Sequence, residues 1–214
     1  MTNEEYADSL KPKIEILQEL RNKAKQLAVG IIGQNLTMDD LFFCASTDRC
    51  MRLIDGFIPM LQERNLTCAG VLLRMQMDNC MRTYAAFIAE NRTEVINAVI
   101  DGKRINKLKD AAGNKMTDGY LKDKIAEDLD TQFATVYDNA SGYVHLSEKA
   151  FYQTVVVCKD YHFNFGIGTP LPEKRNEPLL EAADAYIQFV KLHFRMLQAV
   201  VESKQRFDKE YNES

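Results

Sequence analysis

The chain lacks the short motifs that mark the commonest enzyme classes. It contains no nucleophile elbow G-x-S-x-G, no phosphate-binding loop G-x-x-x-x-G-K-[ST] and no dinucleotide fingerprint G-x-G-x-x-G. It has neither an H-E-x-x-H nor an E-x-x-H helix motif, and its three histidines form no zinc-ligand pattern. The sequence therefore argues against the common hydrolase, NTPase and dinucleotide classes, and it predicts neither a metal site nor a cofactor.

The chain also lacks paired cysteines and long apolar runs. Its five cysteines are an odd number without a C-x-x-C pair, and four of them lie in helical patterns beside apolar residues, as buried reduced thiols do. The first residues are acidic where a signal peptide would be basic, and no apolar run approaches the roughly 18 residues that a membrane helix requires. We expect a soluble cytoplasmic protein with no membrane segment.

Composition and net charge leave the ligand open. A chain of 214 residues with 46% hydrophobic and 27% charged residues is that of an ordinary globular protein with a sizeable core. The net charge of −4 argues against a globally basic nucleic-acid binder. A local basic patch on an acidic protein remains compatible with such a ligand.

Apolar residues recur at spacings of three and four along most of the chain, which predicts helices. The predicted helices cover residues 10–31, 37–61, 66–91, 93–101, 118–142 and 177–210, and Thr37 with Asp40 forms a capping pair at the second start. The β-branched and alternating residues from 154 to 167 predict a small β-hairpin. We therefore expect a mainly α fold: one domain, residues 1–214, with about five long helices in a bundle and a small β-hairpin excursion near 154–167.

The predicted last helix carries a continuous apolar seam. Its members follow a strict three-four repeat: Leu180, Ala183, Ile187, Val190, Phe194, Leu197 and Val201. Such a seam packs on a neighbouring helix, either inside the bundle or across a dimer. We expect a homodimer, and the alternative is that the seam is filled within the chain.

Three charged residues stand four apart in the predicted helix 66–91. Arg74, Asp78 and Arg82 share one stripe of this helix, whose other faces are largely apolar. One interpretation is a row of ion pairs within the helix surface, which stabilises the fold by about 0.2–0.5 kcal/mol per pair. The other is a pair of guanidinium groups, oriented by Asp78, that binds phosphate.

His145 follows the predicted end of helix 118–142. A lone histidine at a helix C-terminus fits a capping role, because the helix dipole favours a positive charge there. With Asn139 and Ser141 nearby, it also fits a general acid or base, because an imidazole has a pKa of about 6.5. Asn139, Ser141 and His145 are therefore candidate site residues.

A basic stretch lies between the predicted helices 93–101 and 118–142. Residues 102–119 hold five lysines and arginines together with two turn signals, so we expect a mobile basic excursion. Within it, Lys103, Arg104 and Lys107 are the candidate ligand-binding residues for an anion.

The R-x-x-x-[DE] pattern at Arg74 and Asp78, followed downstream by a polar cluster and His145-Leu146-Ser147, resembles the HEPN superfamily, particularly its uncharacterised and abortive-infection branches. The similarity covers about residues 66–147. The resemblance implies a helical bundle that dimerises and cleaves RNA without a metal, with an arginine on the phosphate and a histidine near the 2′-hydroxyl. The chain departs from the R-x(4–6)-H motif, because residues 137–141, where the arginine belongs, include no basic residue.

Two functional hypotheses remain. In the first, the protein is HEPN-like and belongs to a defence or toxin system, where it acts as a metal-independent endoribonuclease or an RNA-binding protein. Arg74 and Arg82 then hold phosphate, Asp78 orients them, and His145 moves the proton. In the alternative, the protein is a non-enzymatic helical interaction module whose basic segment 103–115 contacts a partner protein. The two hypotheses differ in whether His145 lies beside the two guanidinium groups.

Overall fold

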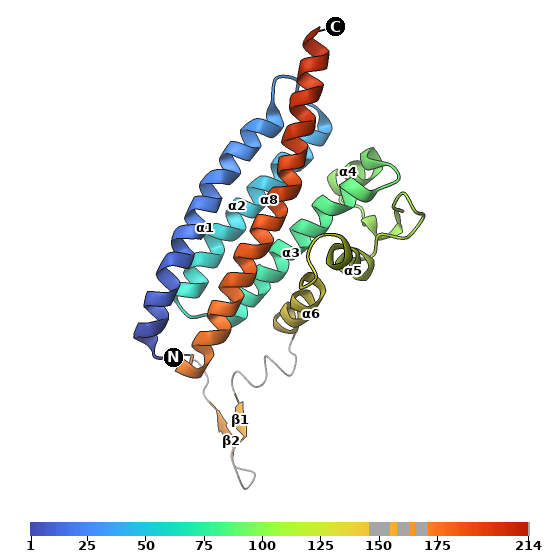
Figure 1. Cartoon of the computed structure of the whole chain (residues 1–214). Coiled ribbons are helices and arrows are strands. Elements are labelled where there is room, and N and C mark those ends of the chain that lie inside the picture. Colours follow the sequence, from blue (N-terminus) through green and yellow to red (C-terminus); the bar gives the residue numbers. More distant parts are fainter. Residues whose placement is uncertain (146–154, 158–162, 166–170, 214) are drawn as a thin grey trace.

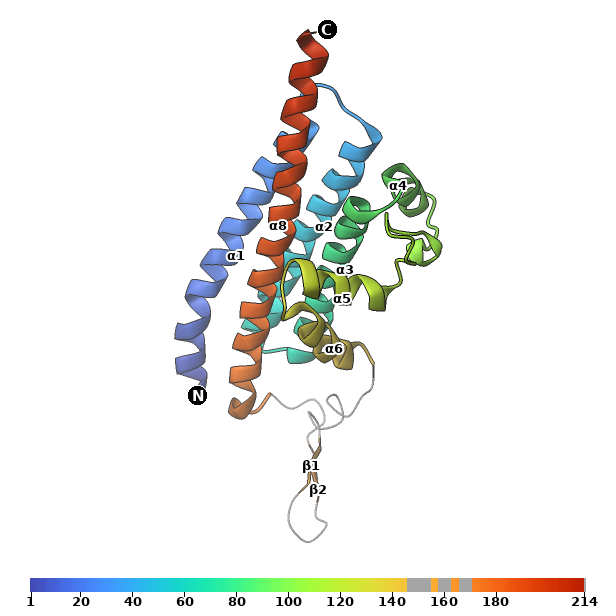
Figure 2. The same ribbon diagram turned by 45° about the vertical axis from the view of Figure 1, so that its right-hand side comes forward.

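Four long helices lie side by side and form the body of the molecule (Figure 1). The computed structural model describes residues 1–145, 155–157, 163–165 and 171–213. The long helices are α1 (Asn3–Ile32), α2 (Met38–Gln62), α3 (Leu66–Ile88) and α8 (Asn176–Glu213). Three shorter helices, α4 (Arg92–Ile100), α5 (Asp118–Asp128) and α6 (Phe133–Val144), pack along α3, on the side of the bundle away from α1 (Figure 2).

The predicted polar cap opens α2. The backbone N–H of Asp40 donates to the hydroxyl of Thr37, and the backbone N–H of Thr37 donates to the carboxylate of Asp40 at 2.7 Å. This capping box confirms the predicted start, because it satisfies backbone donors that a helix leaves unpaired in its first turn. Thr2 and Glu5 form the same arrangement at the start of α1, so that helix begins earlier than the apolar repeat indicates.

The prediction of one helix over residues 118–142 is wrong. The chain turns between α5 and α6, and Asp130 shapes this turn: its carboxylate accepts from the backbone N–H of Gln132 at 3.1 Å and from the side chain of Gln188 on α8 at 2.6 Å. A short acidic side chain that bonds its own backbone favours a turn over a continuous helix. The described part of the chain therefore has four long helices rather than about five.

The basic stretch 102–119 is anchored to the bundle rather than being a free excursion. Ile105, in the short 3-10 helix η1 (Ile105–Lys107), and Met116 are buried. The carboxylate of Asp110 accepts from the backbone N–H groups of Ala112 and Asn114 at 3.0 and 2.8 Å. The backbone N–H of Ala111 donates to the carbonyl of Ile88 in α3 at 2.9 Å, and the hydroxyl of Tyr120 in α5 donates to Asp110. These contacts hold the stretch against α3 and α5, so its basic side chains start from fixed positions.

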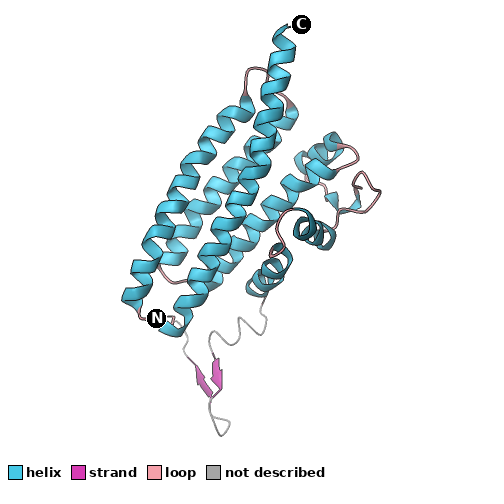
Figure 3. Ribbon diagram, viewed as in Figure 1, coloured by secondary structure: helices cyan, strands magenta, loops and turns pink. Residues whose placement is uncertain are grey.

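Two short strands fall within the range of the predicted β-hairpin. β1 (Val155–Val157) pairs antiparallel with β2 (Phe163–Phe165), and Val156 lies opposite Asn164 (Figure 3). The rest of the predicted range, including the residues that join the two strands, lies outside the described residues.

The apolar seam of α8 is filled within the chain. All of its members are buried: Leu180, Ala183, Ile187, Val190, Phe194, Leu197 and Val201. The helix packs on α1 and α3, and Tyr186 stacks on Phe57 of α2 with ring centroids 3.8 Å apart. Of the two roles proposed for the seam, the internal one therefore holds, and the seam offers no surface for a dimer.

Among the described residues, no helix is both long enough and apolar enough to cross a membrane.

Candidate functional site

Arg74 joins α3 to α6. Its Nε donates to the hydroxyl of Ser141 at 3.2 Å. Its guanidinium lies 3.4 Å above the ring centroid of Tyr137 and also donates to the hydroxyl of that tyrosine. It forms an ion pair with Asp78 at 2.5 Å. Only 14% of the Arg74 side chain is exposed. Two of the guanidinium nitrogens donate hydrogen bonds and the third, Nη1, is held by the ion pair with Asp78. Arg74 therefore stabilises the helix pair and offers little surface to a ligand.

His145 lies beyond the contact between Arg74 and Ser141. The two helices run antiparallel, because Arg74 meets Ser141 while Gly70, earlier in α3, meets Tyr143, later in α6. His145 ends α6, is exposed, and therefore lies toward the start of α3. Among the described residues, no hydrogen bond or ion pair joins it to an arginine.

Arg82 lies two turns beyond Arg74, toward the C-terminal end of α3. It stands eight residues after Arg74, which is about 12 Å of helix, and it pairs with Asp118 in the first turn of α5 at 2.8 Å. Asp78 pairs with Arg74 instead. The structure therefore does not bring Arg74, Arg82 and His145 together within one chain, because His145 and Arg82 lie on opposite sides of Arg74. Their joint catalytic role stays a prediction.

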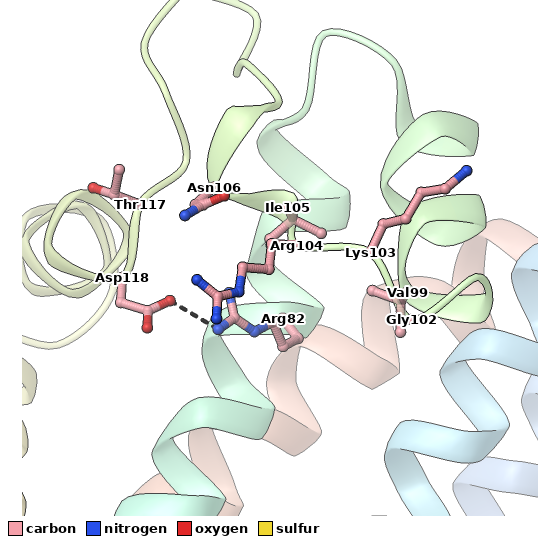
Figure 4. A pocket seen from close by; sticks show the side chains of 9 residues that line it. All are labelled: Arg82, Val99, Gly102, Lys103, Arg104, Ile105, Asn106, Thr117 and Asp118. Atoms are coloured by element: carbon pink, nitrogen blue, oxygen red, sulfur yellow. Dashed lines mark hydrogen bonds and ion pairs between the residues drawn. The ribbon is translucent and has the colours of Figure 1, made fainter.

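Arg82 lines a surface pocket of about 470 Å³, which we call the basic pocket (Figure 4). Its walls come from α3, from α4 and η1 with the connection between them, and from the start of α5. They consist of Arg82, Val99, Gly102, Lys103, Arg104, Ile105, Asn106, Thr117 and Asp118. The pocket thus brings together three of the basic residues that the sequence singles out, Arg82, Lys103 and Arg104.

The charges of the basic pocket are unevenly paired. Arg82 and Asp118 neutralise each other, and Lys103 pairs with Asp101 at 2.8 Å and points away from the pocket in Figure 4. Arg104 is exposed and extends in that view toward Asp118, beside Arg82. Arg104 forms no ion pair with any described residue. The pocket therefore holds one guanidinium group whose charge is not neutralised by a carboxylate. The start of α5 adds a partial positive charge from its backbone.

The other predicted binding residues lie elsewhere. Lys107 is exposed in η1 and does not line the basic pocket. Asn139 lines a different pocket of about 550 Å³ together with Tyr143 and Arg175. Ser141 contacts Arg74. The predicted ligand-binding set is therefore divided between separate regions, and only Lys103 and Arg104 share a pocket.

A second pocket, of about 400 Å³, adjoins the basic pocket and was missed by sequence reasoning. Its walls come from α2, α3 and α4, and they consist of Phe42, Ala45, Ser46, Arg49, Asp78, Asn79, Arg82 and Val99. It shares Arg82 and Val99 with the basic pocket. No sequence signal marks Arg49, because the approach of α2 to α4 is a property of tertiary packing.

His193 lies buried behind the second pocket. Its Nε2 is 2.9 Å from the hydroxyl of Ser46 and 3.1 Å from that of Thr83. Burial lowers the pKa of His193 to about 3, so the imidazole is neutral at pH 7. Its Nδ1 is buried and has no hydrogen-bond partner in the described part of the chain. A catalytic Ser–His pair needs a third group at this nitrogen to stabilise the imidazolium, so we assign the cluster a structural role.

The described residues contain no group of three histidine, cysteine or acidic side chains placed to hold a metal ion. Comparison of the chain with family models, curated proteins and solved structures finds no match. The HEPN resemblance therefore stays a prediction, and function is argued from the geometry of the basic pocket.

Proposed function

We propose that the protein binds the phosphate groups of RNA in the basic pocket and does not cleave them. The observation that carries the proposal is the position of Arg104, an exposed guanidinium without a carboxylate partner among the described residues, beside Arg82 in one pocket. The planar fork of arginine matches the oxygens of a phosphate group and donates two parallel hydrogen bonds to it. An RNA phosphate would supply the anionic partner that Arg104 lacks.

The surroundings of the pocket favour a polyanion over a single small anion. Lys107, Lys109 and Lys115 are exposed on the same anchored stretch that supplies Arg104. Exposed cations on one segment of the chain attract successive phosphates, although the chain as a whole carries a net charge of −4. The protein would therefore bind RNA through a local patch, with an affinity that falls as salt rises.

Binding without cleavage follows from the groups around the pocket. No histidine lines it, and its one carboxylate, Asp118, is held by Arg82. His145, the predicted proton-transfer group, stands on the far side of Arg74. A phosphate between Arg82 and Arg104 therefore has no histidine among the described lining residues, and the one carboxylate there is a weakened base because it is already in an ion pair.

The proposal is tested by fluorescence anisotropy with a labelled single-stranded RNA. Arg104→Ala and Arg82→Ala should each weaken binding by about tenfold, the value of one charged hydrogen-bond pair, and should lower the salt dependence by about one phosphate contact. Arg206→Ala is the matched control, because Arg206 is exposed on α8 outside this pocket. Equal affinity of the wild type and both pocket variants would contradict the proposal.

The absence of cleavage has its own test. The same RNA is incubated with the wild type and with His145→Ala, and its length is followed on a denaturing gel. We expect intact RNA with both proteins. Cleavage by the wild type that disappears in His145→Ala would establish the ribonuclease hypothesis and overturn the non-catalytic one.

A further inference from the structure

The basic pocket and the second pocket are neighbours with a common wall. Both are lined by Arg82 from α3 and Val99 from α4. A ligand whose phosphate lies between Arg82 and Arg104 therefore has the second pocket directly beside it. The volumes of the two pockets, about 470 and 400 Å³, both lie within the range of about 300–1,000 Å³ that small-molecule sites occupy.

Besides Arg82 at the common wall, the second pocket combines apolar walls with a hydrogen-bond donor and an acceptor. Phe42, Ala45 and Val99 supply apolar surface. Arg49 is exposed and can donate, while Asp78, whose Oδ1 pairs with Arg74, keeps a second carboxylate oxygen that can accept. Every nucleobase presents apolar faces together with donor and acceptor atoms on its edge.

The polar side chains at the floor of the second pocket already form hydrogen bonds within the protein. The side-chain amide of Asn79 donates to the backbone carbonyl of Ser46 at 2.9 Å, and the hydroxyl of Ser46 bonds to Asn79, Thr83 and His193. These groups have their partners within the protein. Selection among ligands therefore falls to the apolar walls and to Arg49 and Asp78, and the carboxylate of Asp78 disfavours a second phosphate there.

We propose that the second pocket receives one unpaired nucleobase of the nucleotide whose phosphate occupies the basic pocket. This inference rests on the proposed function and adds its substrate class, which is single-stranded rather than duplex nucleic acid. A paired base has its edge bonded to its partner and its faces stacked, so it cannot enter a pocket at the side of the protein. Arg82, at the common wall, separates the two subsites.

Ala45→Trp tests the base subsite without touching the phosphate subsite, since Ala45 is exposed and lines only the second pocket. The indole should fill the pocket and weaken single-stranded RNA binding about tenfold, the value of one stacked base. Inorganic pyrophosphate, measured by calorimetry, should bind the variant and the wild type equally. Ala7→Trp, at an exposed alanine of α1, is the matched control.

A second variant reports on the base directly. The chain contains no tryptophan, so Phe42→Trp introduces a single indole in the wall of the second pocket, whose emission can be excited apart from that of the tyrosines. A nucleoside monophosphate or a single-stranded RNA should change its emission, and pyrophosphate should not. If only the oligonucleotide binds, the base belongs to an RNA chain, as proposed. If the free nucleotide binds as tightly as the oligonucleotide, the base subsite stands, but single-stranded RNA as its substrate class is wrong.

The failures of the two proposals are distinguishable. If Arg104→Ala weakens RNA binding but Ala45→Trp does not, or if a duplex binds as tightly as a single strand, the base subsite is wrong and the phosphate site stands. If the wild type binds neither pyrophosphate nor RNA, the proposed function is wrong and the base subsite falls with it. Circular dichroism of each variant establishes that its helices are intact.

Discussion

Arg74 and Arg82 occupy equivalent positions on α3 and have different roles. Both stand one turn from Asp78, but this carboxylate pairs with Arg74, whose remaining donors contact Tyr137 and Ser141. Arg82 pairs with Asp118 and borders two pockets. The surroundings contributed by other helices, rather than the spacing along α3, decide which arginine stays available to a ligand.

The burial of His193 makes the stability of the folded protein depend on pH. The folded protein lowers its pKa to about 3 by removing the imidazole from water, whereas an unfolded histidine has a pKa of about 6.5. As the pH falls below 6.5, the unfolded chain takes up a proton that the folded protein does not. This residue therefore lowers the free energy of unfolding as the pH falls below 6.5, and it causes no such loss well above that pH.

We predict that the free energy of unfolding falls between pH 7 and pH 4 by about 3 kcal/mol on account of His193. His193→Gln cannot be protonated, so urea denaturation of this variant should show a correspondingly smaller fall over the same range. His145→Gln, at an exposed position, is the control and should behave as the wild type does. An equal fall in the wild type and His193→Gln would contradict the prediction.

The contact between α3 and α6 depends on a glycine at the scale of these elements. A Cβ atom at Gly70 would lie 2.5 Å from ring atoms of Tyr143, closer than atoms can approach without displacement. Because Arg74 and Ser141 join the same two helices one turn further along, any displacement of α6 also disturbs the arginine contact. Gly70 thus permits the close packing that keeps Arg74 covered.

We predict that Gly70→Ala lowers the free energy of unfolding by about 1–3 kcal/mol, the usual cost of overpacking. Gly56→Ala, in α2, is the matched control, since a Cβ there would lie 3.7 Å from Leu72, which is an ordinary contact. Alanine favours helix over glycine, so the control should be neutral or stabilising. Equal stability changes in the two variants, measured by denaturant unfolding, would contradict the close contact.

At the scale of the whole molecule, the seam of α8 is covered by its own chain, so a homodimer would need another surface. Exposed apolar side chains gather where α1 ends, α2 begins and α8 ends: Val29, Ile32, Leu36, Met38, Leu41, Phe207 and Tyr211. Apolar side chains exposed in one region are typical of a protein-interaction surface. The predicted homodimer, which no observation tests, would use this end of the bundle.

We therefore expect light scattering after size-exclusion chromatography to give twice the chain mass of 24.5 kDa. Met38→Lys should convert this species to a monomer, because a charge in an apolar interface loses its hydration without gaining a partner. Ile100→Lys, on α4, is the matched control, since Met38 and Ile100 are both 53% exposed. A wild type of one chain mass at its highest soluble concentration would show that the dimer prediction is wrong.

The sequence by itself determined the helical class, most helix boundaries and the capping box at Thr37, because apolar periodicity and polar caps act within one or two turns. It also marked Arg82, Lys103 and Arg104. Only the tertiary structure decided that α5 and α6 separate at Asp130, that Arg82 pairs with a residue 36 positions away, and that α2, α3 and α4 enclose a second pocket. Those outcomes depend on which side chains meet across helices, and neither periodicity nor spacing along one helix encodes that.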